Sequence, residues 1–141
     1  MFVVDASIAL AWLLDRSDPD EIAIANQAMR YVELHGAEIP ALWFFEVANG
    51  LLIAERRQQV TQQDTAAFLA DLAQIPIEVD PSSRSVDLAD LISMGRIHNL
   101  TAYDATYLEL ALRRSATLAT FDRKLAAAAR AAGVAVFGDP T

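Results

Sequence analysis

Residues 1–14 read MFVVDASIALAWLL, and this stretch contains the first strand and helix of the pattern that predicts the fold. Phe2–Val4 is a short apolar run that suits a buried strand, and it ends directly at Asp5. The apolar residues from 7 to about 14 then favour a helix. A buried strand that leads through one acidic residue into a helix is typical of parallel α/β sheets, which are covered on both faces.

The same alternation of short strands and helices continues along the chain. Further strands are predicted at residues 38–39, 77–79, 117–119 and 134–137, and further helices at 18–35, 41–57, from 61 onward, 82–97, 101–114 and 122–132. This pattern predicts a three-layer α/β/α domain with a central parallel sheet of four to five short strands. No repeat or linker divides the 141 residues, so we expect one domain spanning 1–141.

Composition excludes several classes of protein. Apolar residues make up 54% of the chain, which argues against intrinsic disorder, and the absence of cysteine removes disulfides, thiolate metal sites and cysteine nucleophiles. The start of the chain lacks the basic segment of a secretory signal, and no run of about 18 uncharged apolar residues is present. We therefore expect a soluble, cytoplasmic protein with no membrane contact.

The formal net charge of −8 is an objection to any nucleic-acid-binding function, because such proteins normally present a basic face. All basic residues except Lys124 are arginines, whose planar guanidinium suits phosphate. The arginines considered for contact with a nucleic-acid backbone are Arg56, Arg57, Arg96, Arg113 and Arg114. Paired arginines near helix ends also complement the helix dipole, so a purely structural role stays open.

Four acidic residues occupy positions where function gathers in such folds. Asp5 and Asp122 directly follow two predicted strands, whereas Glu46 and Asp104 lie in the first turns of predicted helices. Each of the three aspartates also has a structural explanation. Asp5 and Asp122 are suited to N-cap a helix, and Asp104 stands three residues after Thr101 in a capping-box pattern.

Glu46 is harder to explain structurally. It lies in the segment ALWFFEVANGLLIAERR at 41–57, which is apolar on most sides and predicts a deeply buried helix. No basic residue stands within helical reach of Glu46. A buried carboxylate without a partner is costly, so it becomes protonated, pairs with a distant arginine or binds a metal.

Considered together, the four acids predict a metal site. The carboxyl ends of parallel strands and the helix starts that follow them share one edge of the sheet. Four ionised carboxylates gathered there would repel one another by roughly 3 kcal/mol per close pair, and a divalent cation removes that penalty. Oxygen ligands favour Mg²⁺ or Mn²⁺ over zinc.

Four segments of the sequence carry a resemblance to the PIN-domain ribonucleases, and within them to the VapC-type toxins of type II toxin–antitoxin systems. The segments are FVVDASIALAWLL at 2–14, PALWFFEVANGLL at 40–52, HNLTAYDATYLELALRR at 98–114 and LATFDRKL at 118–125. The order of the four acids fits that family over essentially the whole chain. No single segment is decisive, but the complete set is specific.

The resemblance implies a Mg²⁺-dependent endoribonuclease, with Mn²⁺ able to substitute. It assigns the acidic metal positions to Asp5, Glu46, Asp104 and Asp122, and the accessory polar positions to Ser7, Asn49 and Thr120. Cleavage would leave a 5′-phosphate and a 3′-hydroxyl. The implied partners are an RNA substrate, a cognate antitoxin that covers the active-site groove, and a second copy of the chain in a homodimer.

Other functions were weighed against the nuclease. A haloacid-dehalogenase-like phosphotransferase needs a second aspartate two residues after Asp5, where this chain has Ser7. A receiver domain needs paired acids and a well-placed lysine, but Lys124 is the sole lysine. The serious alternative is a catalytically inactive PIN-like module that binds proteins through Trp12, Trp43 and Phe44, although such aromatic residues more often belong to the core.

Overall fold

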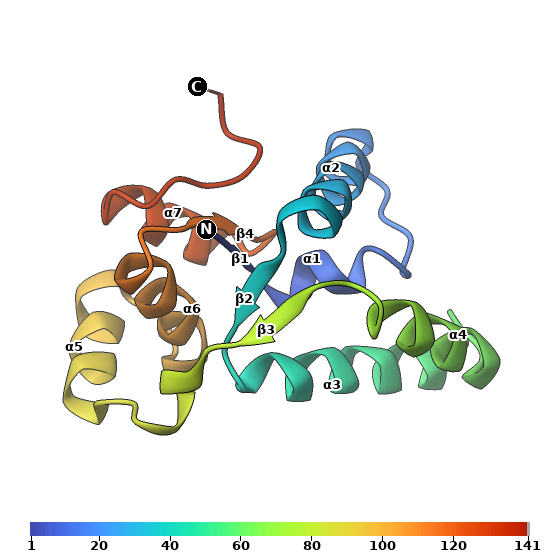
Figure 1. Cartoon of the computed structure of the whole chain (residues 1–141), viewed down its shortest axis with the longest axis horizontal. Helices are drawn as coiled ribbons and strands as arrows, with labels where there is room; N and C mark the ends of the chain where they lie inside the picture. The colour runs from blue at the N-terminus through green and yellow to red at the C-terminus, as the bar shows by residue number, and fades with distance from the viewer. Residues whose placement is uncertain (141) are drawn as a thin grey trace.

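The computed structural model describes residues 1–140, so Thr141, the last residue of the expected domain, lies outside the described residues. Strands and helices alternate along the chain as predicted (Figure 1). In chain order the elements are β1 Phe2–Val4, α1 Ala6–Leu10, α2 Pro19–His35, β2 Ala37–Ile39, α3 Leu42–Arg56, α4 Gln62–Leu72, β3 Ile77–Val79, a 3₁₀ helix Pro81–Arg84, α5 Leu88–His98, α6 Ala102–Arg113, β4 Thr117–Ala119 and α7 Arg123–Ala131.

The four strands form one parallel sheet in the order β3-β2-β1-β4. The chain adds β2 and then β3 on one side of β1, and later places β4 on the other side, where Val3 pairs with Leu118. The strand order therefore reverses at β1. In open α/β sheets the crevice beyond the carboxyl ends of the strands at such a reversal is where ligands bind.

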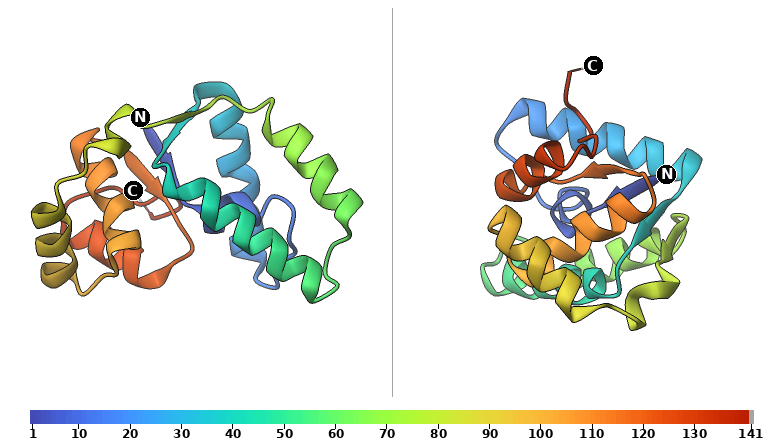
Figure 2. Two further views of the ribbon diagram at one scale, coloured as in Figure 1. Left: turned by 90° about the horizontal axis from the view of Figure 1, so that it is seen from below. Right: turned by 90° about the vertical axis from the view of Figure 1, so that its left-hand side faces the viewer.

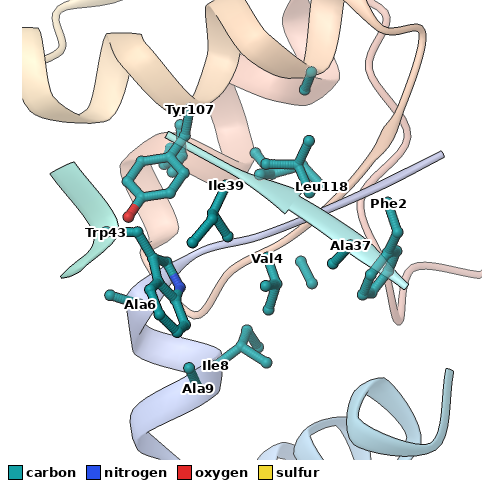
Figure 3. Packing of buried hydrophobic residues seen from close by; sticks show 14 of the residues in the cluster. Phe2, Val4, Ala6, Ile8, Ala9, Ala37, Ile39, Trp43, Tyr107 and Leu118 are labelled. Carbon is teal, nitrogen blue, oxygen red and sulfur yellow. The ribbon is translucent and has the colours of Figure 1, made fainter. Parts of the chain in front are cut away.

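Helices cover both faces of this sheet, which confirms the predicted three-layer α/β/α architecture. In the right-hand view of Figure 2, α2 lies above the strands, and α5 and α6 lie below them. On the α2 side, the ring of Phe2 in β1 contacts Tyr31 at 4.6 Å and Phe137 at 5.2 Å between centroids. The core side chains from β1, β2, β4 and α1 that Figure 3 labels are all buried.

The predicted fifth strand at 134–137 is reduced to a single bridge between Val136 and Leu118. Leu118 donates its N–H to the carbonyl of Ala135, and Phe137 donates its N–H to the carbonyl of Leu118. The chain then turns at Gly138, whose φ of +92° is a conformation that side-chain-bearing residues rarely adopt. The sheet therefore has four strands, the lower end of the expected range.

Two helix predictions were wrong in their bounds. The first helix begins at Ala6 and gives way to turns after Leu10, instead of continuing to residue 14. The helix predicted at 82–97 is divided into the 3₁₀ helix and α5. The division occurs because Asp80 caps the first segment by accepting the N–H of Ser82, and Asp87 then caps α5 as a new N-terminus.

The prediction that the 41–57 helix is deeply buried was also wrong. Only one stripe of α3 is buried, formed by Trp43, Val47, Leu51 and Ala54. Phe45 is 77% exposed and Phe44 52% exposed. The reason lies in the tertiary structure. Helices α3 and α4 extend together beyond the sheet (Figure 1), so no other layer of the fold packs on the outer face of α3.

The aromatic residues considered for partner binding differ in their positions. Trp43 belongs to the buried core, Trp12 packs against that core while partly exposed, and Phe44 reaches the surface. A cavity of about 580 Å³ with mostly apolar walls lies between α3 and α4. Among the helices formed by residues 1–140, we find none with the length and apolar character needed to cross a membrane.

Candidate active site

Asp5 lies at the carboxyl end of β1, where it is 7% exposed. It occupies the N-cap position of α1, but its side chain makes no capping hydrogen bond. Instead, Oδ2 of Asp5 accepts hydrogen bonds from the hydroxyls of Ser7 at 2.9 Å and Thr120 at 2.6 Å. Two of the accessory residues expected from sequence therefore hold the Asp5 carboxylate directly.

The same two hydroxyls join the end of β1 to the end of β4. Ser7 Oγ accepts the N–H of Phe121 at 3.0 Å, and Thr120 Oγ1 accepts the N–H of Asp122 at 3.0 Å. Asp122 N-caps α7 as predicted, because its Oδ1 accepts the N–H of Leu125 at 2.9 Å. The adjacent ends of two parallel strands are thus fixed around two carboxylates.

Glu46 approaches this edge from α3 and has a partner that the sequence did not reveal. The hydroxyl of Tyr107 on α6 donates a hydrogen bond to Oε1 of Glu46 at 2.5 Å. Tyr107 is fully buried, whereas Glu46 is only partly buried, so the expected isolated buried carboxylate is not what the structure contains. Its partner is neutral, and the negative charge of Glu46 therefore remains uncompensated.

Gly50 on α3 faces the Leu10 side chain of α1, and both residues line the cavity that contains Glu46 and Asp5. A Cβ atom at residue 50 would lie 2.4 Å from Cδ1 and 3.2 Å from Cγ of Leu10. Both contacts are closer than van der Waals distance, so any larger residue would force Leu10 or the helices to move. The small residue four positions after Glu46 therefore supports the site.

Asp104 reaches the site from the first turn of α6. Thr101 caps this helix by accepting the N–H of Asp104 at 3.2 Å. The structure shows this half of the predicted capping box, whereas at Thr61 and Asp64 both halves are present. The Asp104 carboxylate lines the cavity that it shares with Asp5 and Asp122.

One cavity of about 440 Å³ brings the predicted residues together at the carboxyl edge of the sheet. It is lined by Asp5, Ala6, Ser7, Leu10, Arg16, Glu46, Asn49, Gly50, Asp104, Phe121 and Asp122. All four acids therefore contribute to it, with Ser7 and Asn49. Thr120 is buried immediately behind Asp5 and acts through its hydrogen bond.

The electrostatics of this cavity are those of crowded carboxylates. Burial raises the pKa of Asp5, the Thr120 and Ser7 hydroxyls oppose the shift, and the charge of Asp122 adds to it. Burial also raises the pKa of Asp104, and the charges of Asp122 and Asp5 raise it further. The mutual repulsion means that ionising the whole set is unfavourable without a counter-charge.

The pKa of Glu46 responds to the same effects of burial and neighbouring charge. Burial raises its pKa, the Tyr107 hydroxyl opposes the shift, and the charges of Asp5 and Asp104 reinforce it. The pKa of Tyr107 is raised far above its usual range by burial and by the neighbouring carboxylates. Tyr107 therefore stays protonated and serves Glu46 as a hydrogen-bond donor.

The chemistry of this donor set fits Mg²⁺ or Mn²⁺, because carboxylate oxygens are the hard ligands that these ions prefer. Within residues 1–140, however, no three His, Asp or Glu side chains already form a group that could hold an ion. The carboxylates of Asp5, Glu46 and Asp122 are instead hydrogen-bonded to the protein. Each of these carboxylates accepts the bonds through one of its two oxygens, so the bonds orient the carboxylate and leave its other oxygen for an ion.

Tyr107, Arg16 and Phe121 belong to the site but were not predicted as site residues. Tyr107 stands three residues after Asp104 on α6, so the two share a helix face, and this spacing was available from sequence. Arg16 and Phe121 come from separate loops, and only the fold places the Arg16 guanidinium 4.2 Å above the Phe121 ring. No sequence spacing indicates that contact.

Two of the arginines considered for nucleic-acid contact serve the structure at the other end of α6. Arg113 donates to both carboxylate oxygens of Asp80, with 2.5 Å from Nη2 to Oδ2, and to Glu109 at 2.7 Å. Arg114 pairs with Glu38 at 3.0 Å. Asp80 is 3% exposed, so this ion pair replaces lost hydration.

The fold and the cavity define a class of protein: a parallel α/β domain with an acidic cavity at the carboxyl edge of its central strands. Comparison with known families identifies the class, since the family model described as PIN domain matches residues 2–131. The chain belongs to the PIN-domain family, which confirms the resemblance seen in the sequence.

Two individual proteins are similar to this chain. Ribonuclease VapC3 from Pyrobaculum aerophilum is 33% identical over 126 residues, which covers 88% of this chain and 91% of the relative. The crystal structure of PAE2754 from Pyrobaculum aerophilum superposes with a TM-score of 0.65 at 23% identity, covering 90% of this chain and 83% of that protein. The second comparison supports the fold.

Proposed function

We propose that this chain is a metal-dependent endoribonuclease and the toxin of a toxin–antitoxin pair, acting as one nuclease domain. The observation that carries the proposal is the convergence of Asp5, Glu46, Asp104 and Asp122 on one cavity at the strand-order reversal. The pKa values of Asp5, Glu46 and Asp104 are raised, partly by repulsion between neighbouring carboxylates, and a divalent cation supplies the counter-charge that relieves this repulsion. The similarity to a protein named ribonuclease supports RNA as the substrate.

In this proposal the four carboxylates would hold Mg²⁺, with Mn²⁺ able to substitute. The chemistry supplied by bound ions of this kind is activation of a water and stabilisation of charge on the leaving oxygen of a phosphodiester. The acidic cavity would thereby become a site for phosphate, which answers the objection raised by the net charge.

The residues of the chain prepare this site by orienting its carboxylates. Ser7 and Thr120 hold Asp5, and Tyr107 holds Glu46. The backbone N–H of Leu125 holds Asp122. Asn49 lines the cavity from α3, where its amide is available to hydrogen-bond RNA.

The implied partners are a cognate antitoxin and a second copy of the chain, and the implied location is the cytoplasm. A protein partner has an apolar surface to bind, because Phe44, Phe45 and Leu52 of α3 and Leu69 of α4 are all exposed. This surface supports the proposal that protein contacts accompany the nuclease function.

The experiment that tests the proposal is cleavage of a mixed-sequence RNA by the purified chain during titration with Mg²⁺ and with Mn²⁺, using EDTA as a control. Asp5→Asn and Asp104→Asn should reduce cleavage to background while leaving the circular dichroism spectrum unchanged, since each removes one carboxylate from the cavity. Asp71→Asn, an exposed acid on α4, is the matched control and should cleave normally.

Two outcomes would contradict the proposal. Cleavage that persists in both site variants would show that the acidic cavity is not the nuclease site. No cleavage with any metal by folded, partner-free protein would favour the alternative, a catalytically inactive PIN-like protein-binding module.

A further inference from the structure

Arg16 is the one basic residue among those that line the acidic cavity in the described part of the chain. It lies in the loop between α1 and α2, and its side chain is 33% exposed. In a cavity dominated by carboxylates, a single guanidinium is the natural contact for a negatively charged ligand.

Two contacts fix the Arg16 guanidinium. Its Nε donates a hydrogen bond to Oε2 of Glu21 at 2.5 Å, and its Cζ lies 4.2 Å above the centroid of the Phe121 ring. Phe121 stands between Thr120 and Asp122, and its backbone N–H is hydrogen-bonded to Ser7. The guanidinium plane is therefore anchored to the same loop that carries two residues of the site.

The contacts leave the terminal nitrogens of Arg16 available for a ligand. Among residues 1–140, Glu21 accepts from Nε, and no hydrogen bond engages either Nη nitrogen. Arg16 also makes no ion pair within 4.0 Å with Asp104, Asp122 or another acid of the cavity in that range. The guanidinium thus forms no direct ion pair with these carboxylates, and its two terminal groups form the fork that matches phosphate oxygens.

We propose that Arg16 binds a phosphate of the RNA strand beside the phosphodiester that is cleaved, and so sets substrate affinity at this site. The inference rests on the proposed ribonuclease function and adds to it the residue that engages the RNA backbone. Glu21 and Phe121 are positioning residues for Arg16, because they hold its plane at the rim of the cavity. Arg113 and Arg114 are committed to buried or partly buried acids instead.

The test compares Arg16→Gln and Arg16→Lys with the wild-type chain. The assay is Mg²⁺-dependent cleavage of a short mixed-sequence RNA. Arg16→Gln should raise KM about tenfold, because one charged hydrogen-bonding contact is lost. Its kcat should stay within about threefold of the wild-type value. The slope of log kcat/KM against log salt should become less steep by about 0.7, as for one lost phosphate contact on a single strand. Arg16→Lys should restore part of the affinity, because it keeps the charge but loses the fork.

Arg130→Gln is the matched control. Arg130 also pairs with a carboxylate, that of Asp139 at 2.7 Å, and its substitution changes the net charge equally, but it does not line the cavity. It should leave KM and the salt slope unchanged. If Arg16→Gln lowers only kcat and melting temperature, or if Arg130→Gln has an equal effect on KM, the proposal is overturned.

A second measurement separates this inference from the ribonuclease proposal. Binding of a fluorescent mixed-sequence single-stranded RNA is followed by anisotropy in Ca²⁺, for the wild type and both Arg16 variants. RNA binding that weakens in Arg16→Gln would support the inference even if the wild type cleaves nothing. Normal cleavage and normal binding by Arg16→Gln would refute it while the ribonuclease proposal stands. A wild type that neither cleaves nor binds RNA would refute both, and would direct attention to an acidic partner protein.

Discussion

The hydroxyl of Tyr107 donates a hydrogen bond to Oε1 of Glu46 at 2.5 Å, joining α6 to α3 across 61 positions of sequence. The Tyr107 ring is fully buried in the core (Figure 3), so its hydroxyl is a fixed point. A neutral donor orients a carboxylate without cancelling its charge. Glu46 is thus held in place yet keeps the negative charge that a cation needs.

Replacing Tyr107 with phenylalanine tests this relationship, because the ring stays in the core and only the hydroxyl is lost. We expect the free energy of unfolding to fall by about 1.5–2 kcal/mol, the lower part of the range for a hydrogen bond to a charged group, because Glu46 is only partly buried. We also expect the Mg²⁺ concentration for half-maximal cleavage to rise several-fold, measured by titration. Tyr103→Phe, on the same helix but 65% exposed, is the control. An unchanged Mg²⁺ requirement in Tyr107→Phe would mean that the bond is only structural.

Glu46→Gln should stabilise the metal-free protein, because it removes one charge from a repulsive group while the amide oxygen can still accept from Tyr107. Since Glu46 is only partly buried, solvent screens part of the repulsion, and the expected gain is on the order of 1 kcal/mol. Thermal unfolding with EDTA measures it. A clearly lower melting temperature would indicate that the charge of Glu46 is compensated within the fold.

The stability of the metal-free protein should depend on pH with a sign fixed by the raised pKa values of Asp5, Glu46 and Asp104. Between the ordinary and the raised pKa values the folded state binds more protons than the unfolded state. Stability from these groups therefore falls as pH rises through that window. Thermal unfolding in EDTA should give a higher melting temperature just above the ordinary carboxyl pKa values of 3.8 and 4.5 than at neutral pH.

Mg²⁺ should reduce this pH dependence, because it binds the ionised carboxylates and stabilises the folded state most where they are deprotonated. A Mg²⁺ stabilisation that is equal at both pH values would contradict the carboxylate site.

Asp80 contributes to the pH dependence of stability with the opposite sign, at lower pH. Burial would raise its pKa, but Arg113 and the N–H of Ser82 hold it below the ordinary value of 3.8. Its stabilisation is present above that value and is lost as pH falls through the lowered pKa.

Arg113→Ala should destabilise the fold without affecting catalysis directly, because it leaves the buried Asp80 carboxylate with the N–H of Ser82 and the more distant Arg114 at 3.7 Å. We expect a loss of about 2–3 kcal/mol in urea unfolding, somewhat below that of a fully buried pair because Arg113 is one-third exposed. Cleavage by the folded variant should keep its KM for RNA. A raised KM at temperatures where the variant is folded would instead make Arg113 an RNA contact.

The local features of this protein were readable from the sequence. Features of this kind depend on neighbours within about four residues. They include the four strand positions, the helix starts at Thr61 and Thr101, and the positions of Asp5 and Asp122 directly after strands. Apolar runs, capping side chains and turn residues act over that range, so they predict secondary structure directly. The parallel α/β class follows because strands that alternate with helices must cross over to pair.

The tertiary structure decided which distant residues meet. Thr120 reaches Asp5 across 115 positions, Tyr107 reaches Glu46 across 61, and Arg113 reaches Asp80 across 33. It also left one face of α3 exposed although that helix is apolar nearly all round, and it placed Arg16 over Phe121. Such pairings depend on how whole helices pack on the sheet. That packing is determined by the apolar surface that many side chains bury together, and the spacing of a few residues in the sequence does not predict it. The sequence therefore determined which carboxylates stand at the edge of the sheet, and packing determined the hydroxyls and the guanidinium that surround them.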